Sequence, residues 1–344
     1  MSRWIDNKLA DRLYMVNQVS DAKNIDPESV EKDWWVMMVL KAVFGMSIAK
    51  YAFFKGGTSL SKGWNLINRF SEDIDIALYR DFFLTERGLA CARCENNNQV
   101  KMLRKASRDF IHGEFKDELE QRLKEMGLDV RVDAVTTHMT AEGEKSIDHD
   151  ADPTVVLVHY PSIFTGSHSY VKPVVKVEIS CLSMREPFEV KRIASLISET
   201  FAEDDDEAAT EIATISPART FLEKAFLLCE EYQRRNPRTL RMSRHLYDLE
   251  KLMDTEYGRA ALRDTKLYHE IVEHRQKFYH VGGVDYAQDL PERIVFCPTG
   301  EVRERLQADY DNMRSSFIYG KAPDFDKLMS RIEELQERFR TLKC

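Results

Sequence analysis

The sequence lacks the features that mark secreted, membrane-spanning or strongly basic proteins. Its 344 residues include only six cysteines, which are too scattered for a disulfide framework and favour a reducing compartment. The densest apolar run, residues 34–40, is far shorter than the roughly 20 residues of a membrane span. The formal net charge is −8, so no global positive field attracts nucleic acid. These absences predict a cytoplasmic protein without a membrane segment, whose contacts with nucleic acid would depend on a local patch.

What is present predicts a two-part α+β protein. With 43% hydrophobic and 31% charged residues, the chain is apolar enough for a substantial core and too apolar for a disordered protein. Strand and helix patterns mix in the first part, and helical patterns alone follow a boundary near 190–215. We predict a helical segment over 1–48, a core with a mixed sheet over 49–200, and a helical domain over 201–344. The helices expected in that last domain are 217–234, 241–255, 257–279, 301–317 and 325–342.

A glycine pair follows the first short apolar strand. The strand is expected over 51–54, and the helical spacing over 60–70 predicts a connecting helix directly after the glycines. Backbone N–H groups at such a turn form an anion site that suits a triphosphate, although glycine alone is also the ordinary residue of turns. The residues expected to contact phosphate oxygens are Gly56, Gly57, Thr58, Lys62 and Arg69.

The next strand carries two carboxylates on one face. Asp73 and Asp75 alternate with Ile74 and Ile76, so the acids point one way and the apolar side chains point into the core. Adjacent carboxylates repel each other unless a cation lies between them, and hard oxygen ligands favour Mg²⁺ or Mn²⁺. For an Asp-x-Asp pair alone, a solvated edge strand is the commoner interpretation.

A later strand adds a third acid. Lys176 and Glu178 share one face of the strand expected over 174–179, so Glu178 becomes a metal ligand if this strand lies beside that of Asp73. Lys176 is counted with the residues that contact the nucleotide. A glycine turn, an Asp-x-Asp strand and a third acid together describe the active site of polymerase β-like nucleotidyltransferases. In such sites shared carboxylates hold two metal ions about 4 Å apart for an in-line displacement at phosphorus.

At these residues the sequence resembles the AbiEii/AbiGii-type nucleotidyltransferases, toxins of bacterial toxin–antitoxin and abortive-infection systems. The resemblance implies a polymerase β-like core and Mg²⁺-dependent transfer of a nucleotide from an NTP to an RNA acceptor. In characterised members that acceptor is the 3′ end of tRNA, and the transfer blocks translation. An antitoxin is expected as a partner. The stretches that carry the resemblance are 54–62, 69–75, 176–178, 221–224 and 243–248, with weaker similarity at 31–33 and over 309–325.

The resemblance also assigns roles to single residues. It implies that Asp73 and Asp75 bind the metal and that Glu178 stands at the third-acid position, where it would help to activate the acceptor hydroxyl. Gly57 and Thr58 match the phosphate loop. The helical domain would contribute Lys224, expected near the triphosphate, and Asp248, which resembles a late aspartate of the family pattern.

One stretch of the helical domain is rich in arginine and contains no acid, residues 233–244. In an acidic protein, such a stretch is where a phosphate backbone would dock. The alternative is a solvated corner whose arginines pair with the acidic residues at 203–207. The residues expected to contact RNA are Arg234, Arg235, Arg238, Arg241 and Arg244.

Two other hypotheses remain open at this point. The same fold modifies a protein side chain or a small molecule in other members of the wider superfamily. A non-catalytic protein that sequesters a partner on a decayed scaffold is the third hypothesis, and the intact acids argue against it.

Overall fold

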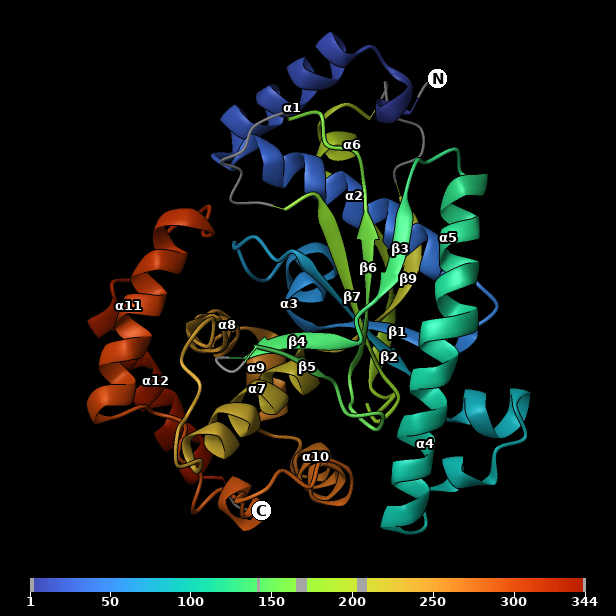
Figure 1. The fold of residues 1–344 in the computed structure, drawn as a ribbon. Helices are drawn as coiled ribbons and strands as arrows, with labels where there is room; N and C mark the ends of the chain where they lie inside the picture. The colour runs from blue at the N-terminus through green and yellow to red at the C-terminus, as the bar shows by residue number, and fades with distance from the viewer. Residues whose placement is uncertain (1–2, 141–142, 165–171, 203–208, 343–344) are drawn as a thin grey trace. The chain divides into compact units, whose positions relative to one another are not determined.

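The structure is a computed structural model in which the chain forms two compact units. The first unit contains Met1–Gly63 and Ser71–Thr214, and the second contains Trp64–Phe70 and Ile215–Cys344. A short early segment, Trp64–Phe70, therefore joins the helical C-terminal part of the chain. The residues that the structure describes are 3–140, 143–164, 172–202 and 209–342 (Figure 1).

The first unit is built on a seven-stranded mixed sheet with the order β3-β6-β7-β2-β1-β9-β8. Strand β2 runs parallel to β7 and antiparallel to β1, whereas β6 is antiparallel to both β3 and β7. The mixed sheet expected from the sequence is thus confirmed. Its strands are β1 (Ala52–Lys55), β2 (Asp73–Leu78), β3 (Arg131–Ala134), β6 (Thr154–His159), β7 (Val174–Ser180), β8 (Phe188–Ile193) and β9 (Thr210–Ile215).

Helices of the first unit pack on the sheet, and α2 runs behind it in Figure 1, in contact with β7. Asp26 caps α2 by accepting a hydrogen bond from the N–H of Glu28 at 2.9 Å, and Pro27 occupies its first turn. Trp34 and Trp35 are buried, so this helix packs into the core. The helices are α1 (Leu9–Lys23), α2 (Pro27–Val43), α3 (Gly56–Thr58), α4 (Asn97–Phe110), α5 (Lys116–Glu125) and α6 (Leu196–Thr200).

The helix expected over 60–70 is wrong beyond its first residues. The chain forms α3 and a π-helical turn over Ser59–Gly63, and it then leaves the helix. Asn65 adopts a left-handed conformation (φ 52°), which a helix does not continue through. The apolar side chains that suggested a helical face are buried instead by tertiary packing in the second unit. There, the Trp64 indole donates a hydrogen bond to the carbonyl oxygen of Ile215 at 3.0 Å.

Four strands escaped sequence analysis, namely β8, β9 and the two strands of a hairpin. In the hairpin, β5 (Gly143–Ser146) pairs with β4 (Thr137–Thr140). Both strands are polar and largely solvent-accessible, so no apolar alternation marks them. Strand β8 lies at the edge of the sheet and carries charged side chains. Such charges discourage an edge strand from pairing with other chains, and they also interrupt the apolar alternation by which a strand is recognised.

The second unit is helical, as expected. The predicted helix over 257–279 is two helices, because Asp264 interrupts it and caps α10 by accepting a hydrogen bond from the N–H of Leu267 at 2.9 Å. None of the helices in the described part of the chain is long and apolar enough to cross a membrane. The helices are α7 (Pro217–Tyr232), α8 (Ser243–Leu252), α9 (Glu256–Ala261), α10 (Thr265–Phe278), α11 (Gly300–Ser316) and α12 (Phe325–Arg340).

Candidate active site

The three predicted carboxylates lie on neighbouring parallel strands. Asp73 of β2 is in register with Lys176 of β7, and Asp75 is in register with Glu178. Sequence analysis made Glu178 a candidate metal ligand only if its strand lies beside that of Asp73, and the two strands are indeed neighbours. Because side chains alternate along a strand, all four residues share one face of the sheet. Asp73, Asp75 and Glu178 are half-buried, and we call them the carboxylate face.

Gly56 makes room for one of these acids. Its φ of +78° is favourable only for glycine, and a Cβ placed on it would lie 1.9 Å from Oδ2 of Asp75. Strands β1 and β2 set this approach, since Lys55 at the end of β1 is in register with Asp75. The Asp75 carboxylate thus occupies the place that a side chain at position 56 would fill. This explains why the residue directly after β1 is glycine.

Thr58 ties the glycine turn to the start of β2. Its hydroxyl donates a hydrogen bond to the carbonyl oxygen of Asp73 at 2.5 Å and lies 2.9 Å from Oγ of Ser71. The Thr58 side chain is buried, so its hydroxyl fixes the backbone of the carboxylate strand. Gly57 lies beside it in the same buried turn. Contact of Gly57 and Thr58 with phosphate stays a prediction.

The two predicted phosphate-binding lysines of the first unit have carboxylate partners. Lys176 forms an ion pair with Glu178. Burial acts to lower the pKa of Lys176, but the charges of Glu178, Asp73 and Asp75 outweigh it and hold that pKa above its usual value. The ammonium is therefore the counter-charge of the carboxylate face. Lys62 is half-buried, and its Nζ lies 2.5 Å from Oδ1 of Asp33 on α2. The sequence did not indicate this partner.

The second unit holds a buried group of ions, which we call the Asp248 network: Arg69, Lys224 and Asp248. The Asp248 carboxylate accepts two hydrogen bonds from the Arg69 guanidinium, at 2.7 and 2.8 Å. Nζ of Lys224 lies 2.9 Å from the same carboxylate and 3.5 Å from Nδ1 of His245. Asp248 is fully buried, and the other two are nearly so. Sequence analysis predicted that Arg69 contacts phosphate; in the structure its guanidinium forms a bidentate ion pair with Asp248.

Burial and neighbouring charge shift the pKa of every member of this network. Burial lowers the pKa of Lys224, and the pull of Asp248 only partly offsets this effect because Arg69 repels the ammonium. Burial alone would raise the pKa of Asp248, but Arg69 and Lys224 hold it below its usual value. The pKa of His245 lies well below its usual value because the ring is buried among cations. His245 is therefore neutral beside Lys224 at neutral pH.

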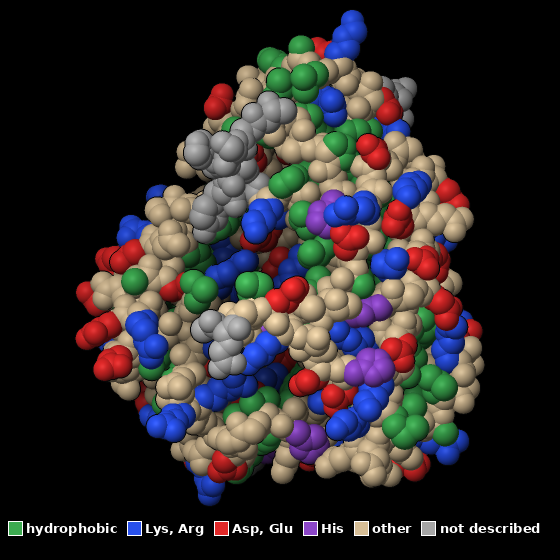
Figure 2. Space-filling model, in the orientation of Figure 1, with side chains coloured by type: hydrophobic (Ala, Val, Ile, Leu, Met, Phe, Trp, Pro, Cys, Tyr) green, Lys and Arg blue, Asp and Glu red, His purple; other side chains and the backbone are tan. Residues whose placement is uncertain are grey.

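The arginine-rich stretch is partly neutralised within its own unit. Arg238 forms an ion pair with Glu231 at the end of α7 at 2.7 Å, and Arg234 approaches the same carboxylate at 3.8 Å. The alternative pairing with residues 203–207 lies outside the described residues. On the face that Figure 2 shows, basic and acidic side chains are interspersed and no large field of one sign forms. Contact with RNA through the five arginines stays a prediction.

The donor set of the carboxylate face fits a hard divalent cation, because carboxylate oxygens are the ligands that Mg²⁺ and Mn²⁺ prefer. Among the described residues, no three His, Cys, Asp or Glu side chains converge into a complete metal cage. Mg²⁺ at phosphoryl-transfer sites commonly takes one or two carboxylates and completes its shell with waters and substrate phosphates. The two aspartates of β2 meet that requirement, whereas Glu178 is held by Lys176.

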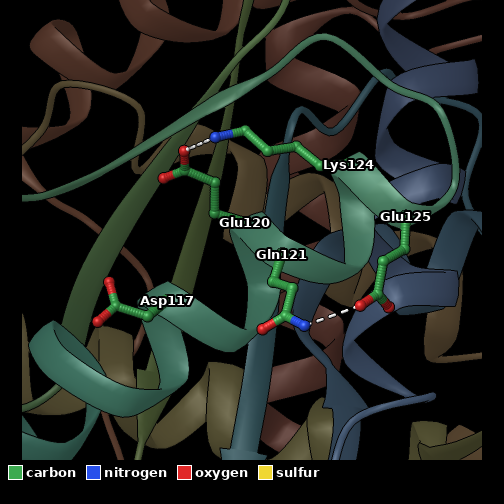
Figure 3. Close-up of a pocket in the computed structure, with 5 residues that line it drawn as sticks. All are labelled: Asp117, Glu120, Gln121, Lys124 and Glu125. Carbon is green, nitrogen blue, oxygen red and sulfur yellow. Dashed lines mark hydrogen bonds and ion pairs between the residues drawn. The ribbon is translucent and has the colours of Figure 1, made fainter.

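A surface pocket elsewhere in the first unit contains none of the predicted site residues. All of its lining comes from α5, where Lys124 pairs with Glu120 and Gln121 donates a hydrogen bond to Glu125 at 2.8 Å (Figure 3). It is an open, mainly acidic depression on one helix, and we assign it no part in the activity. Its lining residues are Asp117, Glu120, Gln121, Lys124 and Glu125.

Comparison with known proteins identifies the class. The family model described as "Nucleotidyl transferase AbiEii toxin, Type IV TA system" matches residues 46–331. A similar solved structure is MenT4, nucleotidyltransferase toxin Rv2826c from Mycobacterium tuberculosis H37Rv, at 14% identity and a TM-score of 0.44, covering 96% of this chain and 99% of that chain. No curated protein matches the chain significantly. The chain is a nucleotidyltransferase. It belongs to the AbiEii family of toxins of type IV toxin–antitoxin systems, because the match spans most of its length.

Proposed function

We propose that this nucleotidyltransferase moves a nucleotide from an NTP to an RNA acceptor, the 3′ end of tRNA, with Mg²⁺ or Mn²⁺ as the cofactor, and thereby blocks translation. The observation that carries this proposal is the register that sets Asp75 beside Glu178 and Asp73 beside Lys176. The glycine turn that admits the Asp75 carboxylate supports it. Membership of a toxin–antitoxin family supports an antitoxin as a partner.

In the proposed reaction, the acceptor hydroxyl oxygen bonds to the α-phosphorus as the bond to the pyrophosphate breaks. Asp73 and Asp75 would hold the metal ion, which when bound aligns the attacking and leaving oxygens and neutralises their charge. Glu178 would accept the proton of the acceptor hydroxyl. Lys176, beside Glu178, would hold the triphosphate against the carboxylate face.

The test is transfer of label from each of four α-labelled NTPs, with Mg²⁺, to total tRNA. We expect one or more NTPs to label tRNA. Asp73→Asn should lower the rate about 1,000-fold or more, because losing a metal ligand removes several kcal/mol of transition-state stabilisation. Asp117→Asn removes an exposed acid of α5 in the same unit and is the matched control, with an unchanged rate expected.

Periodate-oxidised tRNA separates the acceptor sites, because it has no 3′-terminal hydroxyl. Label on intact but not on oxidised tRNA supports transfer to the 3′ end. Label on a protein or a small molecule would instead favour the second hypothesis. No labelled product with any NTP would contradict the proposed function.

A further inference from the structure

Helix α2 carries three consecutive charged residues inside the core. Glu31, Lys32 and Asp33 are 1%, 3% and 7% exposed, and the two residues that follow them are buried tryptophans. Consecutive residues of a helix point about 100° apart, so the three side chains leave the helix in three directions. Each of the three side chains contacts a different segment of the first unit.

Lys32 reaches the starts of two strands at once. Its Nζ lies 2.9 Å from Oε2 of Glu72 and donates a hydrogen bond to the carbonyl oxygen of Lys172 at 3.3 Å. Glu72 directly precedes β2, and Lys172 lies two residues before β7. These strands are parallel neighbours, so both starts lie at the same edge of the sheet. One ammonium group therefore joins the two strands that carry the carboxylate face.

Asp33 holds the glycine turn to the same helix. Its carboxylate binds Nζ of Lys62 at 2.5 Å and accepts a hydrogen bond from the N–H of Leu196 at 2.7 Å. Lys62 belongs to the helical stretch that begins at Gly56, against which the Asp75 carboxylate packs. Adjacent residues of α2 thus anchor the carboxylate strands and the turn between them.

Stability alone does not explain these buried charges. Taking a lysine and its partner out of water costs several kcal/mol per ion, and apolar replacements of similar volume are often neutral or stabilising. An ion pair instead fixes the distance and direction between the two segments it joins, which apolar packing alone would leave free to shift relative to each other.

We propose that Lys32 is a positioning residue, which sets the spacing of the carboxylates on β2 and β7 through Glu72 and the Lys172 carbonyl. Asp33 does the same for the glycine turn through Lys62. This inference rests on the proposed function, because it assumes that the carboxylate face binds the metal ion.

The test compares the wild-type Lys32–Glu72 ion pair with a variant in which both residues are replaced by apolar ones. In Lys32→Met/Glu72→Leu the charges are removed together, so we expect the unfolding temperature to stay within a few degrees of wild type. Binding of Mn²⁺ to the nucleotide-free protein, followed by the electron paramagnetic resonance of free Mn²⁺, should weaken at least tenfold. Nucleotide transfer should fall at least 100-fold. Unchanged Mn²⁺ affinity and transfer in this folded variant would overturn the proposal.

Two single variants keep the test decisive if the pair variant does not fold. Glu72→Gln changes a side chain that is 22% exposed, and it should also weaken Mn²⁺ binding several-fold. Glu31→Gln is the matched control on the same helix, because Glu31 accepts hydrogen bonds only from the loop after β6, at Ser162 and Ile163 among the contacts described. It should lower the unfolding temperature without changing Mn²⁺ affinity. Equal losses of Mn²⁺ affinity in Glu31→Gln and Glu72→Gln would also overturn the proposal.

The wild-type protein separates this inference from the proposed function. Wild type that binds Mn²⁺ but labels no acceptor refutes the transfer, while the Mn²⁺ affinities of the variants still decide the role of Lys32. Wild type that binds no Mn²⁺ refutes the metal site and with it both proposals.

Discussion

The carboxylate face and the Asp248 network carry opposite excess charge. On the carboxylate face three acids share one lysine ammonium, and the Lys176 and Glu178 side chains are 39% and 24% exposed. In the Asp248 network two cations share one carboxylate, and no member is more than 8% exposed. Solvent reaches the first group, as a site for an exchangeable cation requires. The second is closed to solvent and internally paired, as a permanent structural element requires.

The two groups therefore differ in burial, while the predicted site roles of their residues stay predictions. Asp73 and Asp248 are both predicted site residues, and of the two only Asp73 is accessible to solvent. The predictions that follow change charged residues in these two groups and one further buried acid of the helical unit.

The largest effect is expected in the buried network. Asp248→Asn keeps the shape of the side chain but leaves Arg69 and Lys224 without their counter-charge in a dry environment. We expect the free energy of unfolding to fall by about 3–5 kcal/mol, measured by urea denaturation. The same change on the carboxylate face, Asp75→Asn, relieves repulsion and should cost less than about 1 kcal/mol. Equal losses at both positions would erase the distinction.

A second buried acid of the helical unit should make stability depend on pH. Burial and the nearby charge of Glu230 raise the pKa of Asp289 to about 8, while Arg275 opposes them and the Cys229 thiol lies beside the group. Because the folded-state pKa lies above the unfolded value, the stabilisation is complete below about pH 4 and is lost as the pH rises through 8.

The contribution of Asp289 is tested by measuring the free energy of unfolding of wild type and of Asp289→Asn at pH 6 and pH 8. Wild type should lose about 2 kcal/mol more than Asp289→Asn over this interval, since asparagine does not titrate. An equal loss in both proteins would show that another group causes the pH dependence. Glu230 and Arg275 stay unchanged in this pair, so their ion pair at 2.5 Å is common to both.

The smallest effect is expected for the counter-charge of the carboxylate face. Lys176→Met removes an ammonium that repels a divalent cation, and a unit charge about 8 Å from a divalent cation contributes about 1 kcal/mol even in water. Mn²⁺ should therefore bind the nucleotide-free variant about fivefold more tightly. The KM for NTP should rise if Lys176 also holds the triphosphate. Weaker Mn²⁺ binding would show that Lys176 does not compete with the metal ion.

The local parts of the site were predictable because they depend on short-range periodicity. Alternation along β2 was enough to put Asp73 and Asp75 on one face and the isoleucines in the core. The turn was marked by its glycines. The neighbouring strand for Glu178 was predictable only as a condition, because the order of strands in a sheet is not encoded in their alternation.

The partners of the charged side chains were not predictable in the same way. Lys62 and Arg69 lie in sequence near the glycine turn, and this proximity suggested phosphate contacts for both. Their ion pairs are formed instead with Asp33 and Asp248, which lie 29 and 179 residues away. A hydrogen-bonded ion pair depends on a match of position and direction within about 3 Å, which no local pattern reports.

By itself, then, the sequence determined the class of enzyme, the mixed sheet, the helical C-terminal part and the two aspartates that face one way. The sheet, the helices and the facing aspartates follow from hydrophobic periodicity, and the class of enzyme follows from the resemblance of continuous motifs to a known family. Only the tertiary structure decided that β7 lies beside β2, that Asp75 fills the space of a missing Cβ, and that α2 holds the strands through Lys32. Those features join segments far apart in sequence, and burial decides which charges stay accessible and which become paired inside the fold.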